Sequence, residues 1–257
     1  MLFNPWCNST IHTRGRHRIV ALREKRGVRA KIIEKLGETI RGHYEAPATI
    51  AEDLKRLGME KTARPIRAEL PKTKRGRSGD FGEVLATEYL NERTQFRVPI
   101  NRLRYKDGRD LALRGDDLIG ILDRESVLNF LKGEAKSRQL ISASVVKEAR
   151  DALEANNSRP SAFSLNFVAK RLLEKPDAES QELGRMIRNA LAERSLARNQ
   201  IHHLIFTVSG NGSTNLLEQD LEQYRGRIPV ESVDLMTADH EILIAQIFAE
   251  ASNVGNR

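Results

Sequence analysis

The feature that most constrains the fold of this chain is a pair of strand-sized apolar runs separated by a short charged turn. The first run, DLIGILD, covers residues 117–123, and the second, VLNFLKGEAKSR, covers residues 127–138. The turn from Asp123 to Ser126 is short enough to fold the second strand back beside the first as an antiparallel neighbour. The sequence therefore predicts a β-hairpin near the middle of the chain.

Two acids and a lysine are predicted to meet at one end of this hairpin. Glu134 and Lys136 stand two residues apart on the second strand, so their side chains face the same side. Asp117 begins the first strand, at the end where the second strand carries this pair. The two carboxylates and the carbonyl of Ala135 form an oxygen-rich site that suits Mg²⁺ or Mn²⁺.

Such a cation would lower the pKa of a bound water and stabilise charge on a scissile phosphate. Lys136 would orient that water and oppose the negative charge that develops in the transition state. We expect Glu83, on the preceding helix, to supply a further carboxylate to the metal, with Glu88 as a weaker alternative. Strand alternation places Asp116 on the opposite side, as a reserve ligand or a residue behind the ligands.

An isolated Glu-x-Lys pair is common by chance and often marks an exposed ion pair at a strand end. Here the pair ends an apolar strand, and Asp117 begins the strand that the predicted hairpin places beside it. This context favours a nuclease centre. Six basic residues are expected along the approach to the site, where they suit phosphate contacts or are ordinary solvated strand edges. They are Arg97, Arg102, Arg104, Lys106, Arg109 and Arg114.

The charge of the chain is concentrated near its N-terminus. Residues 1–78 hold 19 Lys and Arg against 8 Asp and Glu, within a formal net charge of +8 for all 257 residues. A basic segment on a mildly acidic body is typical of a polyanion binder, because Lys and Arg neutralise phosphates. DNA is the expected partner, and a solvated face or a protein partner is the alternative.

The remaining composition excludes several classes of protein. Cys7 is the single cysteine, so neither a disulfide framework within the chain nor a zinc site built on thiolates can form. Apolar runs fall short of the roughly 18 residues of a membrane span, and residues 1–10 lack the order of a secretory signal. We therefore expect a cytoplasmic protein that does not contact membranes.

The chain is predicted to have two parts: a basic, mainly helical N-terminal region over residues 1–77 and a main domain over residues 78–257. A Pro-, Gly- and basic-rich linker is expected at 65–79, and 96–105 is expected as a strand.

The later half of 11–35 and residues 49–58 are expected as helices, the second capped by Thr49 with Glu52 three residues on. Further helices are expected from Asp80 onward, at 143–156, within 161–199 and at 239–252, and further strands at 203–209 and 230–236. This mixture indicates an α/β layer fold.

Three stretches also resemble a known family. PKTKRGRSGDFGEVLATEYL at 71–90, FRVPINRLRYKDGRDLALRGDDLIGI at 96–121 and GEAKSR at 133–138 resemble HamA, the nuclease subunit family of the Hachiman anti-phage system, and its AbpA-like relatives. The resemblance covers roughly residues 70–140. It implies a PD-(D/E)xK restriction-endonuclease-like core, with a mixed central sheet flanked by helices. It also implies a separate superfamily 2 helicase subunit, HamB-like, that controls access to DNA.

The resemblance carries catalytic roles onto Asp117, Glu134 and Lys136, and less firmly onto Glu83. The sequence therefore predicts a Mg²⁺- or Mn²⁺-dependent DNA endonuclease or nickase that serves anti-phage defence with a helicase partner. Two alternatives stay open: a housekeeping PD-(D/E)xK nuclease of repair or restriction, and a non-catalytic DNA-binding subunit whose basic N-terminal region binds the DNA.

Overall fold

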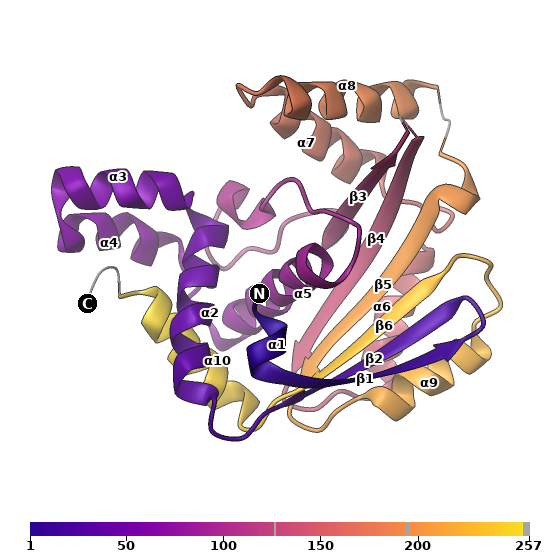
Figure 1. The fold of residues 1–257 in the computed structure, drawn as a ribbon, viewed down its shortest axis with the longest axis horizontal. Helices are drawn as coiled ribbons and strands as arrows, with labels where there is room; N and C mark the ends of the chain where they lie inside the picture. Colours follow the sequence, from indigo (N-terminus) through magenta and orange to yellow (C-terminus); the bar gives the residue numbers. More distant parts are fainter. Residues whose placement is uncertain (126, 194–195, 254–257) are drawn as a thin grey trace.

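The central feature of the molecule is a mixed β-sheet with helices on both faces (Figure 1). The computed structural model describes residues 1–125, 127–193 and 196–253. Within them, six strands follow the spatial order β1-β2-β6-β5-β4-β3. The strands are β1 (Cys7–Arg14), β2 (His17–Glu24), β3 (Leu118–Arg124), β4 (Val127–Arg138), β5 (Ile201–Ser209) and β6 (Val230–Met236). The prediction of a mixed central sheet flanked by helices is confirmed.

The predicted hairpin is present at one edge of this sheet. Strands β3 and β4 pair antiparallel, with Leu118 opposite Gly133 and Arg124 opposite Val127. Ser126, which we placed in the turn, lies outside the described residues. The far side of β4 pairs parallel with β5, from Phe130 opposite Ile201 to Arg138 opposite Ser209. This parallel neighbour fixes the half of β4 that carries Glu134 and Lys136.

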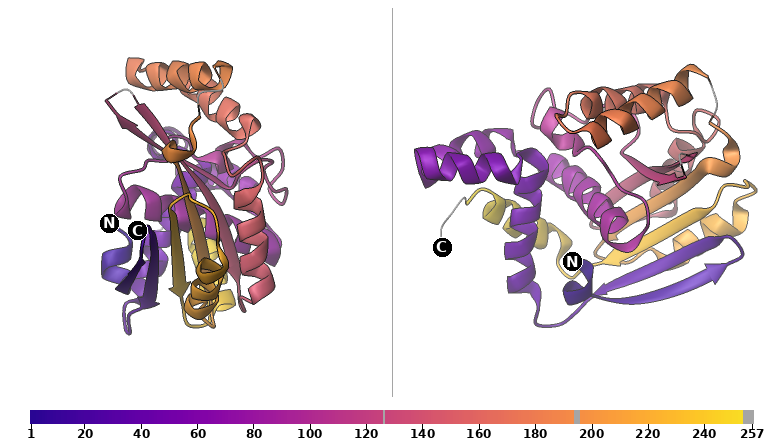
Figure 2. Two further views of the ribbon diagram at one scale, coloured as in Figure 1. Left: turned by 90° about the vertical axis from the view of Figure 1, so that its right-hand side faces the viewer. Right: turned by 45° about the horizontal axis from the view of Figure 1, so that its top comes forward.

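The helices divide between the two faces of the sheet (Figure 2). One face, called here the α5 face, packs against three helices: α2 (Arg29–Tyr44), α5 (Lys74–Arg93) and α10 (His240–Ala251). The other, the α6 face, packs against α6 (Ala143–Glu154), α7 (Ala162–Leu173) and α9 (Thr214–Gln223), and α8 (Ala178–Ala192) packs on α7. The expected helices at 143–156 and 239–252 and strands at 203–209 and 230–236 are confirmed to within a few residues.

Helix α5 is a core helix, and it begins at Lys74, six residues before the Asp80 at which a helix was expected. Phe81, Val84, Leu85 and Leu90 are all fully buried against the sheet. Its N-cap is Thr73, whose Oγ1 accepts a hydrogen bond from the backbone N–H of Gly76 at 3.1 Å. The helix therefore presents one face, including the residues around Glu83, to the β3–β4 hairpin.

The N-terminal segment differs from the prediction. The expectation of a mainly helical region missed β1 and β2, which form an antiparallel hairpin. Strand β2 pairs parallel with β6, from Arg18 opposite Glu231 to Arg23 opposite Met236, so this hairpin extends the sheet of the later segment. The IVAL run of β2, residues 19–22, is buried throughout and shows no alternation. The division at residues 77 and 78 stays a prediction, and one continuous sheet runs across it.

Three further expectations about the first 105 residues were wrong. Helix α3 spans Pro47–Leu57 with Ala46 as N-cap, so Thr49 lies inside the helix instead of capping it. Helix α4 (Met59–Glu69) continues through Pro65, which leaves residues 70–73 between α4 and α5 in place of the expected linker. In place of a strand at 96–105 there is a single bridge between Arg97 and Ile121, then the 3₁₀ helix η1 (Arg102–Tyr105). The short helices α1 (Phe3–Trp6) and η2 (Arg198–Gln200) complete the described elements.

No helix in the described part of the chain is both long enough and apolar enough to cross a lipid bilayer.

The pair of α7 and α8 offers a test of how tightly the α6 face is packed. A Cβ added at Gly184 would lie 2.9 Å from Leu173 Cγ and 3.0 Å from the backbone oxygen of Ala169. We expect Gly184→Ala to lower the free energy of unfolding by about 1–3 kcal/mol because of overpacking. Gly79→Ala in α5, where a Cβ meets nothing within 4 Å, should raise it by up to about 1 kcal/mol. Urea unfolding of both variants measures the difference, and equal midpoints would contradict this packing.

Candidate active site at the β3–β4 hairpin

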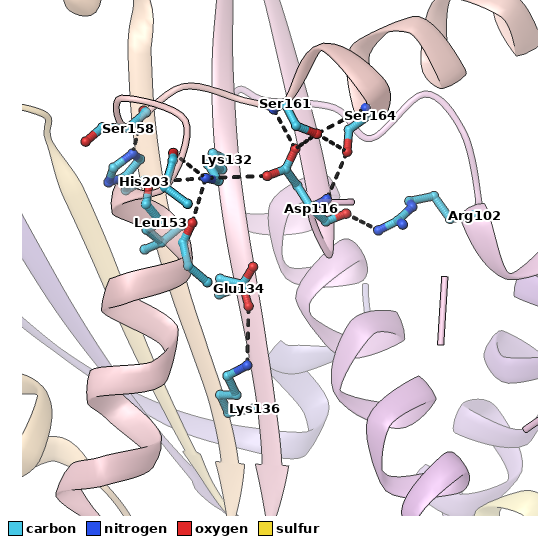
Figure 3. Close-up of polar contacts among 12 residues, drawn as sticks. Arg102, Asp116, Lys132, Glu134, Lys136, Leu153, Ser158, Ser161, Ser164 and His203 are labelled. Carbon is cyan, nitrogen blue, oxygen red and sulfur yellow. Dashed lines mark hydrogen bonds and ion pairs between the residues drawn. The ribbon is translucent and has the colours of Figure 1, made fainter. Parts of the chain in front are cut away.

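Glu134 and Lys136 lie on the α6 face of β4, as strand alternation predicts (Figure 3). Lys136 Nζ lies 3.3 Å from Glu134 Oε2. The Glu134 side chain is buried and that of Lys136 is half-buried. An ammonium group and a carboxylate therefore lie side by side, largely shielded from solvent, near the carboxyl ends of the parallel strands β4 and β5.

Asp117 lies directly before β3 and contacts β4 at the same level. Its Oδ2 accepts a hydrogen bond from the backbone N–H of Ala135 at 3.1 Å, between Glu134 and Lys136 in sequence. The strand register continues this arrangement, since Leu118 stands opposite Gly133. The structure thus brings together the three predicted residues Asp117, Glu134 and Lys136.

Glu134 has an altered pKa for a clear physical reason. Burial raises the pKa of its carboxyl group to about 8, and the negative charge of Asp117 acts in the same direction. The ammonium group of Lys136 opposes this rise. Glu134 therefore holds its proton more tightly than an exposed glutamate, unless a further positive charge enters the site.

Glu83 extends from α5 toward the same aspartate. Burial raises its pKa to about 8, followed by repulsion from Asp117, while the positive charge of Arg102 opposes the rise. Glu83, Arg102 and Asp117 line one small cavity of about 10 Å³, roughly the space of a single water. Asp117 is therefore the carboxylate that links Glu83, on the helix, with Glu134, on the strand.

The donor atoms of these residues fit a hard divalent cation. The three carboxylates supply only oxygen ligands, and Mg²⁺ commonly takes one or two carboxylates and keeps several waters. In the portion of the chain that is described, no group of three or more His, Cys, Asp or Glu side chains is arranged to hold a metal ion. A cation here would bind through two carboxylates, a main-chain oxygen such as that of Ala135, and waters.

Asp116 lies behind the candidate ligands, which is one of its two expected roles, but not on the expected face of the strand. It was expected on the opposite side from Asp117, but its carboxylate lies 3.5 Å from Lys132 Nζ, whose side chain shares the α6 face with Glu134 (Figure 3). The reason is that β3 begins only at Leu118, so strand alternation does not apply to residue 116. Asp116 is 5% exposed and belongs to a buried ion pair.

Lys132 is a residue near the site that our sequence interpretation missed. Its side chain is 1% exposed, and its ammonium group donates to the carbonyl oxygens of Ala152, Leu153 and Ala155 at 2.6, 3.2 and 3.1 Å. These carbonyls end α6, where a helix carries unpaired acceptors and partial negative charge. A lysine in the interior of an apolar strand was the available signal, because such a charge needs buried partners.

Asp116 connects Lys132 to the start of α7. Its Oδ2 accepts hydrogen bonds from the backbone N–H and the hydroxyl of Ser161, both at 2.8 Å. Its backbone N–H donates to Ser164 Oγ at 2.8 Å. The backbone just before Asp117 is therefore held by the N-terminal turn of α7.

Arg102 holds the same backbone from the other side. Its guanidinium donates to the carbonyl oxygens of Asp116, Asp117 and Arg114, the last two at 2.8 Å. Arg102 was expected to contact phosphate, and in the structure its N–H groups hold this backbone. A planar fork of donors suits such a task better than a lysine would.

Other cations of the expected phosphate-binding set are also engaged within the protein. Lys106 is buried with Asp80, which also accepts from the Tyr44 hydroxyl, and the two carboxylate oxygens of Asp80 lie 3.0 and 2.8 Å from Lys106 Nζ. Arg97, Arg104 and Arg109 donate to main-chain carbonyls. Glu88, the weaker metal candidate, lies 2.8 Å from His43 Nε2. The pairing of Lys106 with Asp80 and of Glu88 with His43 favours structural roles for Lys106 and Glu88, whereas, among the described residues, Arg97, Arg104 and Arg109 contact only neutral groups.

The fold and site define an α/β protein in which a hairpin of a mixed sheet presents two acids and a lysine. The HamA family model matches residues 1–251, and the chain belongs to the HamA family. The chain is also similar to the Hachiman protein HamA of Bacillus cereus, with 27% identity over 151 residues. That match covers 59% of this chain and 52% of the Bacillus protein, so it spans about half the length of that relative.

The buried ion pair predicts a stability difference between two lysines. Lys132→Met should lower the free energy of unfolding by about 3–5 kcal/mol, because it leaves the Asp116 carboxylate buried without its partner. Lys147→Met is the matched control, since Lys147 pairs with Asp151 on the exposed surface of α6 and should change stability by well under 1 kcal/mol. Adding Asp116→Asn to Lys132→Met should recover part of the loss. Urea unfolding measures all three, and similar values for the two lysine variants would contradict the assignment.

The raised pKa values of Glu83 and Glu134 predict an unusual pH dependence. Each carboxyl binds its proton more tightly in the folded protein than in the unfolded chain, where the pKa of a glutamate is 4.5, so metal-free protein should lose stability as pH rises from about 4.5 to about 8. Glu134→Gln should flatten this slope, whereas Glu88→Gln should not. Thermal unfolding in EDTA across this pH range is the measurement. Stability that is flat or rises with pH in the unsubstituted protein would refute the burial of these charges.

Proposed function

We propose that this chain is a metal-dependent DNA endonuclease or nickase of the PD-(D/E)xK type. The observation that carries the proposal is the convergence of Asp117, Glu134 and Lys136 at one end of the hairpin. The Asp117 carboxylate lies 3.1 Å from the Ala135 N–H, and Lys136 Nζ lies 3.3 Å from Glu134. This spacing of acid, acid and lysine suits phosphodiester hydrolysis.

In this proposal each residue of the site has a distinct role. A bound Mg²⁺ or Mn²⁺ supplies Lewis-acid polarisation of a phosphate oxygen and lowers the pKa of water. Asp117, Glu134 and the Ala135 carbonyl hold that cation, and Glu83 contributes a carboxylate from α5. Lys136 orients the attacking water and donates toward the negative charge that grows on the phosphate.

The electrostatics of the site support a cation in this place. Burial and the charge of Asp117 both raise the pKa of Glu134 and of Glu83, so the site favours positive charge. A divalent cation would compete with protons for these carboxylates and offset their repulsion. In a protein that only binds DNA, by contrast, burying mutually repelling carboxylates together would serve no function.

Membership of the HamA family supports a role in anti-phage defence. The similar protein of Bacillus cereus carries the name Hachiman protein HamA, which supports placing this chain in the same kind of system. We propose that a superfamily 2 helicase subunit, HamB-like, is its partner and controls when the site reaches DNA.

Substitutions at the site test the nuclease proposal. Asp117→Asn, Glu134→Gln and Lys136→Met should each reduce cleavage of supercoiled plasmid in Mg²⁺ or Mn²⁺ by about 10²-fold or more, since each removes a charged group at the reacting phosphate. EDTA should abolish cleavage. Glu88→Gln, on the same helix as Glu83, is the control and should retain activity. The assay is run with and without the proposed helicase subunit.

Two outcomes would contradict the proposal, the first its nuclease activity and the second its active-site residues. If the protein binds plasmid but does not cut it under any metal or partner condition, a DNA-binding subunit replaces it. If it cuts and the three site variants cut equally well, the active site lies elsewhere. Circular dichroism of each variant shows whether the fold is retained.

A further inference from the structure

A groove with a volume of about 650 Å³ lies on the α5 face of the sheet, at the end where β4, β5 and β6 begin. Its lining includes Asn129 and Leu131 of β4 and His202 of β5. Strand alternation puts Asn129 and Leu131 on the face opposite to Lys132 and Glu134. The rise from Asn129 to Glu134 is about 16 Å. The groove is therefore a different place from the candidate active site.

Four arginines from separate segments line this groove. Arg16 comes from the turn between β1 and β2, Arg18 from β2, Arg93 from the end of α5 and Arg124 from the end of β3. Arg16 and Arg124 are exposed, and both hydrogen bond to neutral groups: Arg16 Nη1 to the carbonyl oxygen of Arg227 at 2.8 Å, and Arg124 Nη2 to Gln95 Oε1. Their full charges remain available to a ligand.

The two carboxylates of the groove are already engaged by donors of the chain. Glu92 accepts from the backbone N–H groups of Leu2 and Phe3 and lies 3.5 Å from Arg93 Nε. Glu231 accepts from the Tyr89 hydroxyl and lies 3.7 Å from Arg18 Nε. Burial and then the positive charge of Arg124 lower the pKa of His202, which agrees with an excess of positive charge here.

The apolar side chains that line this groove, such as Phe96 and Leu131, are buried in the core. Among the described residues, nine large apolar side chains are exposed, and none of them lines this groove. Val127, one of the nine, stands opposite Arg124 beside the groove, and Ile242 and Leu140 lie near the other end of the sheet, beyond the last residues of β4 and β6. Protein interfaces are anchored by Trp, Tyr and Arg side chains in desolvated pockets, whereas the planar donor fork of a guanidinium group matches the geometry of phosphate oxygens. The chemistry of the groove favours a polyphosphate chain.

We propose that this groove is a second DNA-contact surface that binds the phosphodiester backbone away from the site of cleavage. The inference rests on the proposed function only in identifying the polyanion as DNA. Arginine forks bind phosphate oxygens in pairs, without reading the bases. DNA held here is kept at a high effective concentration near Glu134, so the groove acts on affinity and leaves the chemical step unchanged.

Binding measurements in a cleavage-deficient protein test this proposal. In the Glu134→Gln background with EDTA, the pair Arg16→Ala and Arg124→Ala is compared with the matched pair Arg56→Ala and Arg185→Ala. Both control arginines are exposed and lie on helices away from the groove, α3 and α8. The readout is fluorescence anisotropy of a labelled 30-base-pair duplex over a salt series.

We expect the groove pair to weaken binding about tenfold or more at moderate salt. It should also reduce the slope of log K against log salt by about 2, since each lost phosphate contact contributes about 0.9. The control pair should change binding less than twofold. Because no cleavage is measured, failure of the nuclease proposal would leave this result interpretable.

Equal effects of the two pairs, or an unchanged salt slope, would overturn the proposal. A polyglutamate peptide is titrated as a second probe. If the peptide binds as tightly as the duplex and only its binding falls in the groove pair, the groove serves an acidic protein segment and the DNA assignment is wrong. Because Arg16 and Arg124 are exposed, both variants should keep the circular dichroism spectrum and unfolding midpoint of the parent.

Discussion

The ammonium group of Lys132 lies where water does not reach, and the segments around the candidate site are arranged to satisfy it. Three carbonyls at the end of α6 accept hydrogen bonds from it, and the Asp116 carboxylate balances its charge. Asp116 in turn binds the first turn of α7 through Ser161. One buried charge thus ties β4, the start of β3 and two helices together. Since Asp117 follows Asp116 directly, this network sets the position of the acid that faces Glu134.

The two kinds of buried charge around the hairpin have different consequences. The pair of Lys132 and Asp116 is balanced, so it holds structure and leaves no net charge to bind a ligand. The acids around Asp117 are unbalanced, because the positive charges of Lys136, Arg102 and Lys106 offset only part of the rise in pKa that burial and the repulsion among three carboxylates cause. The difference in charge balance therefore distinguishes the structural pair of Lys132 and Asp116 from the candidate binding site around Asp117. The imbalance is the physical reason to expect a cation beside Asp117 and none beside Asp116.

Elements whose apolar side chains recur with a helical or strand period could be predicted from the sequence. Elements without such a period could not. The β3–β4 hairpin, α5 and the convergence of Asp117, Glu134 and Lys136 followed from alternation and helical spacing. Strand β2 was missed because residues 19–22 are buried on both faces, so their apolar run has no period of two. Strand β1 is exposed along nearly its whole length, so burial gives no alternation there either. Pro65 suggested a boundary, yet α4 continues through it because Ala63 and Ile66 are packed in the core.

The position of Asp116 and the use of the arginines could not be predicted, because both depend on partners far away in sequence. Arg102 donates to the backbone carbonyls of residues 114, 116 and 117, and Lys106 pairs with Asp80, so two cations expected to bind phosphate hold the loop before β3. A count of basic residues near a site therefore overstates the charge that a ligand can use. Positive charge remains available where arginines contact neutral groups or acids that are already engaged. Arg16 and Arg124 in the groove contact neutral groups, so their positive charge is available, although the total charge of the chain did not predict a binding surface there.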